Sequence, residues 1–211
     1  MNIREKHKVG EYLVANDAAG VVALAQLDVL EIHTWNSSAD DVERPDRLVI
    51  DLDPGDGVGW RDVVAAARRV RAALDALELP SRVKTTGGVG LHVVVPLRPV
   101  ADWARCLEVA RQFCAALARA EPARFTTLVG KQHRRGRIYL DYLRNNRTNT
   151  SVCAFSTRAR PGAPVSMPLG WSELGRVAPE AFTLRTVPRL LARRRRDPWA
   201  GYFESGAILP A

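Results

Sequence analysis

Cysteine is scarce in this sequence, and no long apolar run occurs in it. The only cysteines are Cys106, Cys114 and Cys153. An odd count without zinc-type spacing argues against a disulfide scaffold and indicates a reducing compartment. Cys106 and Cys114 lie in a helical pattern, which predicts two small buried side chains. No run reaches the about 18 apolar residues of a membrane helix, and no signal peptide opens the chain, so we expect a cytoplasmic protein without a membrane partner.

Repeats and low-complexity linkers are also missing. Apolar residues make up 46% and charged residues 26% of the chain, so we expect a full core and no extended disorder. The 31 lysines and arginines exceed the 23 acidic residues and give a net charge of +8. This surplus favours a polyanionic partner, because lysine and arginine neutralise phosphates. A high-GC genome raises the arginine content as well, so the charge alone does not identify nucleic acid.

The hydrophobic patterns predict an α+β fold, with a mixed or antiparallel sheet and helices packed on it. Asp17 is predicted to cap the first helix, over 17–27. Two further helices are expected over 60–78 and 102–120. Strands are expected over 11–16, 29–34, 47–53, 82–86, 91–95 and 137–143, and near 151–155.

We expect a catalytic domain over residues 1–190 and a basic tail over 191–211. The tail contains the run "RRRR" at 193–196. Such a run is typical either of a solvated helix face or of a segment that contacts phosphates. The composition does not decide between the two.

Two carboxylates, Asp51 and Asp53, stand at the end of an apolar run, and Pro54 and Gly55 then end the predicted strand. Residues two apart on a strand face the same side, which places these two about 7 Å apart. Like charges this close need a counter-charge, and carboxylates suit Mg²⁺ and Mn²⁺. Two such ions about 3.5–4 Å apart would hold the groups of a phosphoryl transfer. The alternative is a solvated strand end with ordinary turn chemistry.

A third carboxylate, Asp141, lies at an alternating position of the predicted strand 137–143. We expect Tyr139, Asp141 and Leu143 on one face and Ile138 and Leu140 on the other. Aspartate is disfavoured in strands, although it could lie on an exposed face or pair with an arginine. With Asp51 and Asp53, it completes the ligand set of a two-metal centre.

The stretch "KTTGGVGLHV", residues 84–93, is a second candidate site. Its glycines, Gly87, Gly88 and Gly90, allow a close approach of the backbone, and exposed N–H groups there can bind an anion. Thr86 adds a hydroxyl, and His92 could donate to a phosphate. The alternative is a hairpin turn with a packed histidine. Further cations that could bind a triphosphate or lie in solvated loops are Lys131, Arg134, Arg158 and Arg160.

Three segments together resemble the polymerase (primase-like) domain of bacterial DNA ligase D, in the archaeo-eukaryotic primase superfamily. They are "DRLVIDLDPG", "KTTGGVGLHVVVPL" and "GRIYLDYLRNNRTNTSVCAFSTRARPGAPVSMPLGWSEL". The resemblance covers roughly residues 5–190 and extends to the order and spacing of the motifs. It implies a primase-polymerase-like catalytic core.

The resemblance implies a nucleotidyltransferase that adds nucleotides, with a preference for ribonucleotides, to DNA ends and gaps in non-homologous end joining. It implies Mn²⁺ or Mg²⁺ in a two-metal site and nucleoside triphosphates as substrates. It also implies Ku and a DNA ligase as protein partners, and a bacterial, nucleoid-associated location. The implied metal ligands are Asp51, Asp53 and Asp141, and the implied nucleotide-binding residues are Thr86, Gly87, Gly88, His92, Lys131, Arg134 and Arg158.

Two features depart from the family pattern. The glycine motif usually contains a lysine where this chain has Val89, so one cation is missing. The family domain also has a further N-terminal part, which is expected to be missing here. Both departures favour a second hypothesis, a catalytically weak module that binds DNA ends. A third, a metal-dependent phosphatase or nuclease, would use the same carboxylates but has no evident general base.

Overall fold

The protein is described by a computed structural model covering residues 1–4 and 8–210, and it consists of two compact units, one up to Leu30 and one from Glu31 onward. In the first unit β1 (Asn2–Arg4) pairs antiparallel with β2 (Val9–Glu11), and α1 (Ala18–Gln26) follows. The Asp17 side chain accepts the Gly20 N–H, which confirms the predicted N-cap. The strand predicted over 11–16 is wrong beyond Glu11.

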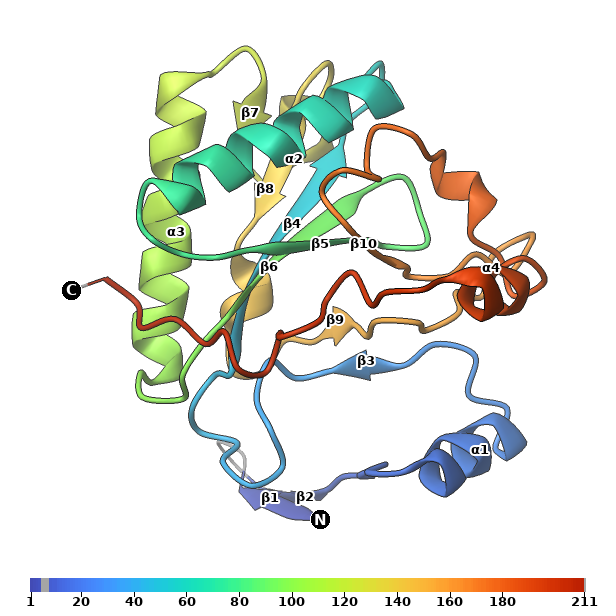
Figure 1. Cartoon of the computed structure of the whole chain (residues 1–211). Coiled ribbons are helices and arrows are strands. Elements are labelled where there is room, and N and C mark those ends of the chain that lie inside the picture. The colour runs from blue at the N-terminus through green and yellow to red at the C-terminus, as the bar shows by residue number, and fades with distance from the viewer. Residues whose placement is uncertain (5–7, 211) are drawn as a thin grey trace. The chain divides into compact units, whose positions relative to one another are not determined.

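The second unit is built on a sheet whose described strands run in the order β10-β5-β6-β4-β8-β7 (Figure 1). Neighbouring strands are antiparallel except β7 and β8, which are parallel. The predicted mixed sheet is thereby confirmed, and so is the hairpin of β5 and β6. The strand bounds are β4 Arg47–Pro54, β5 Arg82–Thr85, β6 Leu91–Pro96, β7 Phe125–Thr126, β8 Ile138–Asp141 and β10 Pro168–Leu169.

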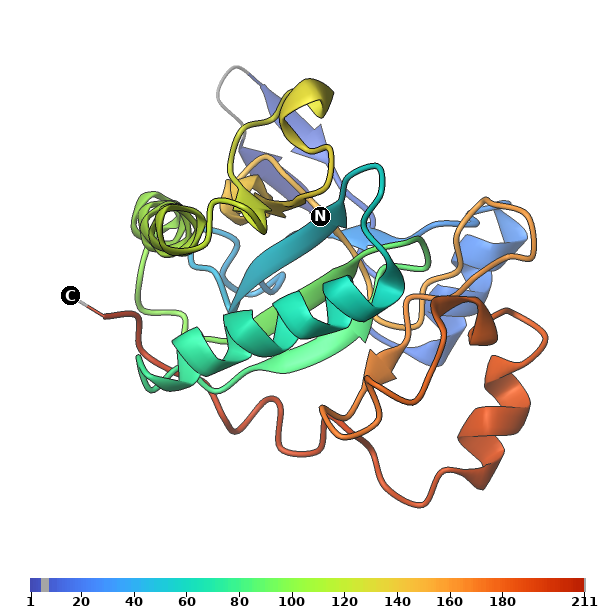
Figure 2. The same ribbon diagram turned by 90° about the horizontal axis from the view of Figure 1, so that it is seen from above.

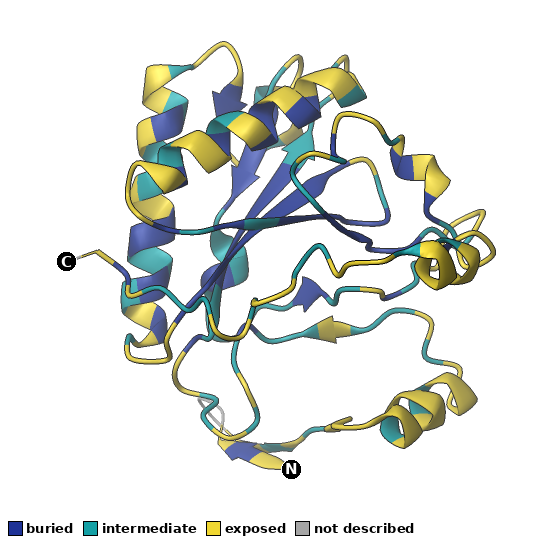
Figure 3. Cartoon of the chain, viewed as in Figure 1, coloured by how far each residue is buried: buried dark blue, intermediate teal, exposed yellow. Residues whose placement is uncertain are grey.

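Alternation along the central strands separates an apolar face from a polar one. On β4, Leu48, Ile50 and Leu52 belong to the hydrophobic core, whereas Asp51 and Asp53 point to the opposite face. Figure 3 shows that the central strands are almost wholly buried. Because both faces are covered, the polar residues on the second face lie in a partly enclosed environment.

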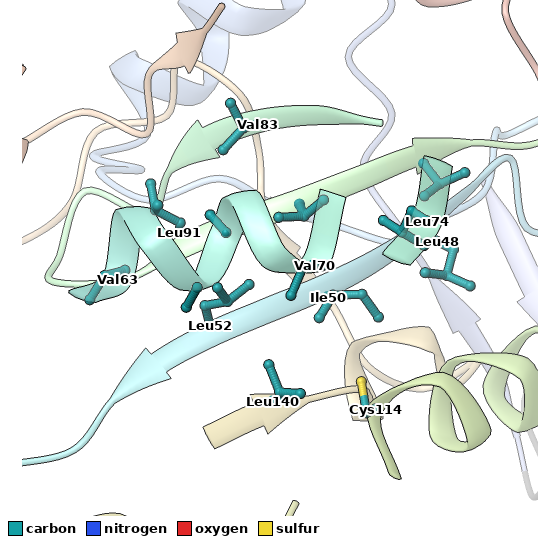
Figure 4. Close-up of a cluster of buried hydrophobic side chains, with 14 of the residues drawn as sticks. Leu48, Ile50, Leu52, Val63, Val70, Leu74, Val83, Leu91, Cys114 and Leu140 are labelled. Atoms are coloured by element: carbon teal, nitrogen blue, oxygen red, sulfur yellow. The ribbon is translucent and has the colours of Figure 1, made fainter. Parts of the chain in front are cut away.

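Two long helices, α2 (Trp60–Asp75) and α3 (Trp103–Ala120), cover the apolar face. Seen from above, α3 is viewed nearly end on while α2 lies lengthwise (Figure 2). Val70 of α2 faces the β4 leucines and isoleucine, and Cys114 of α3 lies near Leu140 of β8 (Figure 4). Cys106 and Cys114 are both fully buried, as predicted.

The helix predicted over 60–78 ends earlier, at Asp75. Glu78 adopts a left-handed conformation with φ of 56°, and the Leu79 N–H bonds back to the Leu74 carbonyl. These contacts close the helix end, as in a Schellman motif. Leu77, which lies beyond the end of α2, is 46% exposed.

A small two-stranded sheet joins β3 (His33–Thr34) to β9 (Ser151–Val152) in antiparallel register. Of the longer strands predicted over 29–34 and near 151–155, only these two-residue segments are strands. The strand predicted over 137–143 ends at Asp141, because residues 143–145 form the 3₁₀-helix η2 (Leu143–Asn145). Leu143 is thus not on the strand face predicted for it.

The remaining helical elements are η1 (Lys131–His133), η3 (Pro179–Ala181) and α4 (Val187–Arg193). Beyond α4 the chain returns to the sheet, since Ala207 pairs with Leu97 and Leu209 is buried in the core cluster. The Trp199 indole also donates to the Val83 carbonyl. The domain boundary at 190 stays a prediction.

Candidate metal centre and adjoining pocket

Four polar side chains lie in one row across the polar face of the sheet. The register places Lys84 of β5 opposite His92 of β6, His92 opposite Asp51 of β4, and Asp51 opposite Asp141 of β8. All four are at most 8% exposed. Antiparallel pairing of adjacent strands thus brings together residues from distant parts of the sequence.

The three predicted carboxylates converge at one end of this row. One oxygen each from Asp51, Asp53 and Asp141 can be chosen so that all lie within 4.8 Å of one another. Asp51 and Asp53 are two positions apart on β4, and Asp141 is directly opposite Asp51 on β8. The alternative of a solvated strand end does not fit Asp51, which is 4% exposed.

The carboxylates differ in how easily they ionise. Burial raises the pKa of Asp53 to about 6, and the charges of Asp51 and Asp141 add to this rise. Burial and the Asp51 charge likewise raise the pKa of Asp141, although Arg144 opposes the rise. For Asp51 burial also favours the neutral form, but His92, Arg144 and Lys84 outweigh it and lower the pKa. Burial and mutual repulsion thus oppose the ionisation of Asp53 and Asp141, whereas Asp51 is kept ionised.

Asp51 provides the test of whether a metal ion fits. Its Oδ2 contacts His92 Nε2 at 3.3 Å and Arg144 Nε at 3.2 Å, whereas its Oδ1 is buried and has no hydrogen-bond partner among the described residues. An unpartnered buried carboxylate oxygen is costly unless a cation binds it. Three carboxylates are also the donor set that hard divalent cations prefer. The residues present therefore fit Mg²⁺ or Mn²⁺.

Sequence reasoning missed Arg144, which contacts both Asp51 and Asp141 at 3.2 Å. Its position in η2 is fixed by Asn145, whose side-chain amide exchanges hydrogen bonds with the Val49 backbone. The sequence signal was an arginine three residues after the predicted ligand Asp141. Lys84 was also missed; it is buried and donates to the Ser166 hydroxyl at 2.7 Å.

His92 lies beside the carboxylate cluster, not in the open turn. It is 2% exposed, and its Nδ1 has no hydrogen-bond partner among the described residues. Burial lowers its pKa to about 4, and the Lys84 charge contributes to this shift. The imidazole is therefore neutral at physiological pH, and because its Nε2–H faces the Asp51 carboxylate at 3.3 Å, its Nδ1 can only accept a hydrogen bond.

A pocket of about 200 Å³ adjoins the carboxylates. Its wall includes the glycine turn between β5 and β6, in which the Thr86 hydroxyl donates to the Gly90 carbonyl and accepts the Gly88 N–H. A side chain at Gly90 would lie 2.5 Å from the Leu52 carbonyl, so the turn can approach β4 only with glycine there. The lining residues are His33, Asp51, Asp53, Thr86, Gly88, Val89, Gly90, His92, Arg144, Val152, Arg158 and Arg160.

The predicted cations take different positions. Arg158 and Arg160 line the pocket, whereas Lys131 lies exposed in η1 and does not line it. Arg134 lies 3.7 Å from Asp53 and stacks on the Tyr139 ring, so it borders the carboxylates.

Gly87 and Val89 complete the turn. Gly87 adopts a left-handed conformation with φ of 68° and packs against Arg158, although it does not line the pocket. Val89 lines the pocket and is 64% exposed. Val89 therefore does not pack against the sheet.

The chain matches the family model described as LigD, primase-polymerase domain, over residues 1–199. It is 40% identical over 192 residues to the multifunctional non-homologous end joining protein LigD of Pseudomonas aeruginosa, covering 90% of this chain and 23% of that protein. It is 32% identical over 182 residues to the bifunctional LigD of Bacillus subtilis, covering 84% of this chain and 29% of that protein. The chain therefore spans about a quarter of the length of these relatives.

A solved structure is also similar, the polymerase domain of Mycobacterium tuberculosis ligase D in complex with DNA. It matches with a TM-score of 0.85 at 26% identity, and the match covers 98% of this chain and 74% of that chain. The α+β class and the mixed sheet agree with this fold. In the described part of the chain, no helix is both long enough and apolar enough to cross a membrane.

Proposed function

This chain belongs to the LigD primase-polymerase domain family, and on that premise we propose that it is a metal-dependent nucleotidyltransferase acting on DNA ends and gaps. The observation that supports this most is the carboxylate cluster of Asp51, Asp53 and Asp141, with its unpartnered buried oxygen. A cluster of this kind beside a pocket with arginines suits a substrate that carries several phosphates.

The proposal gives each group a task. Asp51, Asp53 and Asp141 hold Mn²⁺ or Mg²⁺, which when bound supplies positive charge to the attacking and leaving oxygens of a phosphoryl transfer. Arg144 spans Asp51 and Asp141 and fixes their orientation. The glycine turn offers backbone N–H groups to the triphosphate, and the neutral imidazole of His92 lies against Asp51 in the pocket wall and orients that carboxylate.

Finer parts of the proposal follow from the family. We propose that ribonucleotides are preferred and that Lys131 and Arg134 contact phosphates at the edge of the site. We also propose that the protein acts in non-homologous end joining together with Ku and a DNA ligase, at the bacterial nucleoid. The names of the relatives, which include non-homologous end joining, support the pathway.

One observation favours a second candidate, a weakly catalytic module that binds DNA ends. Val89 is exposed and apolar where the glycine motif usually carries a lysine, so the pocket has one cation fewer. Such a module would retain DNA while adding nucleotides slowly. The two candidates differ in one measurable property, which is primer extension.

The test is a gel assay with a labelled primer on a gapped duplex, Mn²⁺, and each ribonucleotide and deoxyribonucleotide in turn. We expect the wild-type protein to extend the primer and Asp51→Asn to reduce extension by at least about 10²–10³-fold, because one charged ligand is lost. A mobility shift without extension would support the end-binding module, and a shortened primer would support a nuclease.

The matched control is Asp75→Asn, which removes an exposed carboxylate at the end of α2, where it pairs with Arg71 at 3.4 Å. This variant should extend primers at the wild-type rate. Mn²⁺ binding by calorimetry should be lost in Asp51→Asn and kept in Asp75→Asn. An Asp51→Asn protein with unchanged Mn²⁺ affinity would contradict the metal assignment.

A further inference from the structure

Arg158 lies in the pocket, but its guanidinium is already engaged by the protein. Its Nη1 donates to the Thr86 carbonyl at 2.7 Å, at the start of the glycine turn. Its Nε is 3.0 Å from the Glu31 carboxylate, a charge contact whose geometry is not that of a hydrogen bond. A Cβ added at Gly87 would lie 2.6 Å from the Arg158 Cγ, so the Arg158 side chain packs against the turn at this glycine. Arg158 therefore connects the turn to Glu31.

Glu31 is fixed from three directions. Its Oε1 accepts the Ala159 N–H at 2.8 Å, and its Oε2 contacts both Arg158 and the His33 Nε2, the latter at 2.9 Å. The hydrogen bonds from His33 and Ala159 lower the pKa of Glu31 to about 2, so it is ionised at neutral pH. The carboxylate is thus held as an anion against the Arg158 guanidinium.

The backbone around Glu31 is tied to the same segment. Ile32 donates to the Ser156 hydroxyl at 2.8 Å and accepts the Cys153 N–H at 2.9 Å, next to the pairing of β3 and β9 (Figure 1). Residues 157–165 form a hairpin closed by the Thr157 bridge to Val165, and Arg160 lies near its tip. Glu31 is therefore one of the contacts that hold this hairpin: Glu31 contacts residues 158–159, and on the opposite side in sequence terms Thr183 pairs with Pro164.

Arg160 differs from Arg158 in having a guanidinium with no ion pair in the part of the chain that the structure describes. Its Nη1 would lie 2.9 Å from a side chain placed on Gly88, so it reaches over the glycine turn. It also lines the pocket and is exposed to solvent. Among these two arginines, Arg160 is the one available to an anion.

We propose that Glu31 is a positioning residue for the phosphate-binding wall of the pocket: it holds Arg158 against the glycine turn and thereby directs Arg160 at the polyphosphate. This inference rests on the proposed function for the identity of the anion. It assigns different roles to the two arginines. Arg158 maintains the wall, and Arg160 makes the contact with the substrate.

The test is a double-mutant cycle with Mn²⁺·ATP binding measured by calorimetry. Glu31→Gln keeps the shape and one acceptor but removes the charge, and we expect it to weaken binding about tenfold, as for a lost charge-assisted contact. In an Arg158→Met background the same change should have almost no further effect, because the two residues act through one contact. Arg160→Met should weaken binding in either background.

Glu173→Gln is the matched control, because Glu173 also accepts a backbone N–H, from Gly170, and pairs with an arginine, Arg194, but does not line the pocket. It should bind Mn²⁺·ATP like the wild type even if both glutamate variants melt at a lower temperature. Unchanged ATP affinity in Glu31→Gln would overturn the proposal. An equal loss in the Arg158→Met background would overturn it as well.

Hydrogen exchange separates this inference from the proposed function. Glu31→Gln should speed amide exchange at residues 86–90 and 158–163 without any nucleotide, and Glu173→Gln should not. If the wild-type protein bound no triphosphate, the proposed function would fail, whereas the exchange data would still decide whether Glu31 positions the wall. Unchanged exchange in both segments would overturn the positioning role.

Discussion

At the scale of single residues, the site depends on how burial and charge act on neighbouring groups. Asp51 stays ionised although it is buried, because His92, Arg144 and Lys84 surround it. Asp53 lies beside it on the same strand face and has a raised pKa of about 6, because burial and the two other carboxylates act on it together. Two aspartates on the same face of one strand thus have pKa values shifted in opposite directions.

Val89 provides the first prediction at this scale. Because Val89 is 64% exposed at the pocket wall, a lysine there can extend into solvent or toward the triphosphate without strain. A charge-assisted contact of about 1.5–3 kcal/mol corresponds to roughly one to two orders of magnitude in affinity. We therefore expect Val89→Lys to lower the nucleotide KM by about tenfold or more, with little change in melting temperature.

Steady-state kinetics on the two proteins measure this effect, and Val89→Met is the uncharged control of similar length. The control should keep the wild-type KM. A Val89→Lys enzyme that is folded and active but has an unchanged KM would show that the turn does not meet the triphosphate.

At the scale of elements, long periodic segments were predictable and short ones were not. The apolar alternation of β4 and the spacing of α2 and α3 fix these elements locally, so their existence follows from the sequence. The strand predicted over 11–16 is absent beyond Glu11, and the one predicted over 29–34 is only His33–Thr34. Whether such short segments form strands depends on the strand that pairs with them. β3 is a strand only through its bonds to β9.

The candidate site was also predictable only in part. Asp51, Asp53 and Asp141 could be grouped because strand geometry sets which face each occupies. Arg144 follows Asp141 by three residues, but its contact with Asp51 could not be predicted, because these two residues are distant in sequence and meet only through η2. The contact of Glu31 with Arg158 likewise depends on where the hairpin 157–165 lies. The register that aligns Lys84, His92, Asp51 and Asp141 is likewise a property of the assembled sheet.

Helix α4 leads to a prediction about DNA. Arg194 pairs with Glu173, but five other arginines near this helix are exposed and form no ion pair within the described residues; they are Arg185, Arg189, Arg193, Arg195 and Arg196. If such arginines neutralise phosphates, each contact adds about 0.9 to the slope of log K against log salt. With about four contacts the wild-type slope should be near −3 to −4.

Fluorescence anisotropy with a labelled duplex at several salt concentrations tests this. The double variant Arg189→Gln, Arg193→Gln should reduce the slope by about 2 and weaken binding to all sequences alike. The double variant Arg61→Gln, Arg119→Gln, at exposed arginines of α2 and α3, controls for the loss of two charges. A slope that stays the same in the double variant would mean that α4 is a solvated helix face.

At the scale of the whole molecule, repulsion among the three carboxylates lowers the free energy of unfolding, and a bound cation would remove this repulsion. A ligand at 100 times its Kd stabilises the folded state by about 2.7 kcal/mol, and each kcal/mol raises Tm by about 2–4 °C in a chain of this size. We therefore expect saturating Mn²⁺ to raise the melting temperature by about 5–10 °C.

Asp53→Asn should reverse this balance. It removes one of three close negative charges, so the variant should melt at a higher temperature than the wild type when divalent cations are absent. It should also lose the rise caused by Mn²⁺. Differential scanning calorimetry with and without EDTA measures both effects, with Asp75→Asn as the control. A Mn²⁺-dependent rise that persists in Asp53→Asn would remove Asp53 from the ligand set.

The polar row across β5, β6, β4 and β8 also bears on how the protein folds. Its members come from several segments of the chain, and β4 and β8 are separated by α2, three strands, α3 and η1. Closing such long loops is slow, so contacts of this kind form late. The carboxylate cluster is complete only after the last of these strands has joined, which makes Mn²⁺ capture a kinetic marker for the final step of sheet assembly.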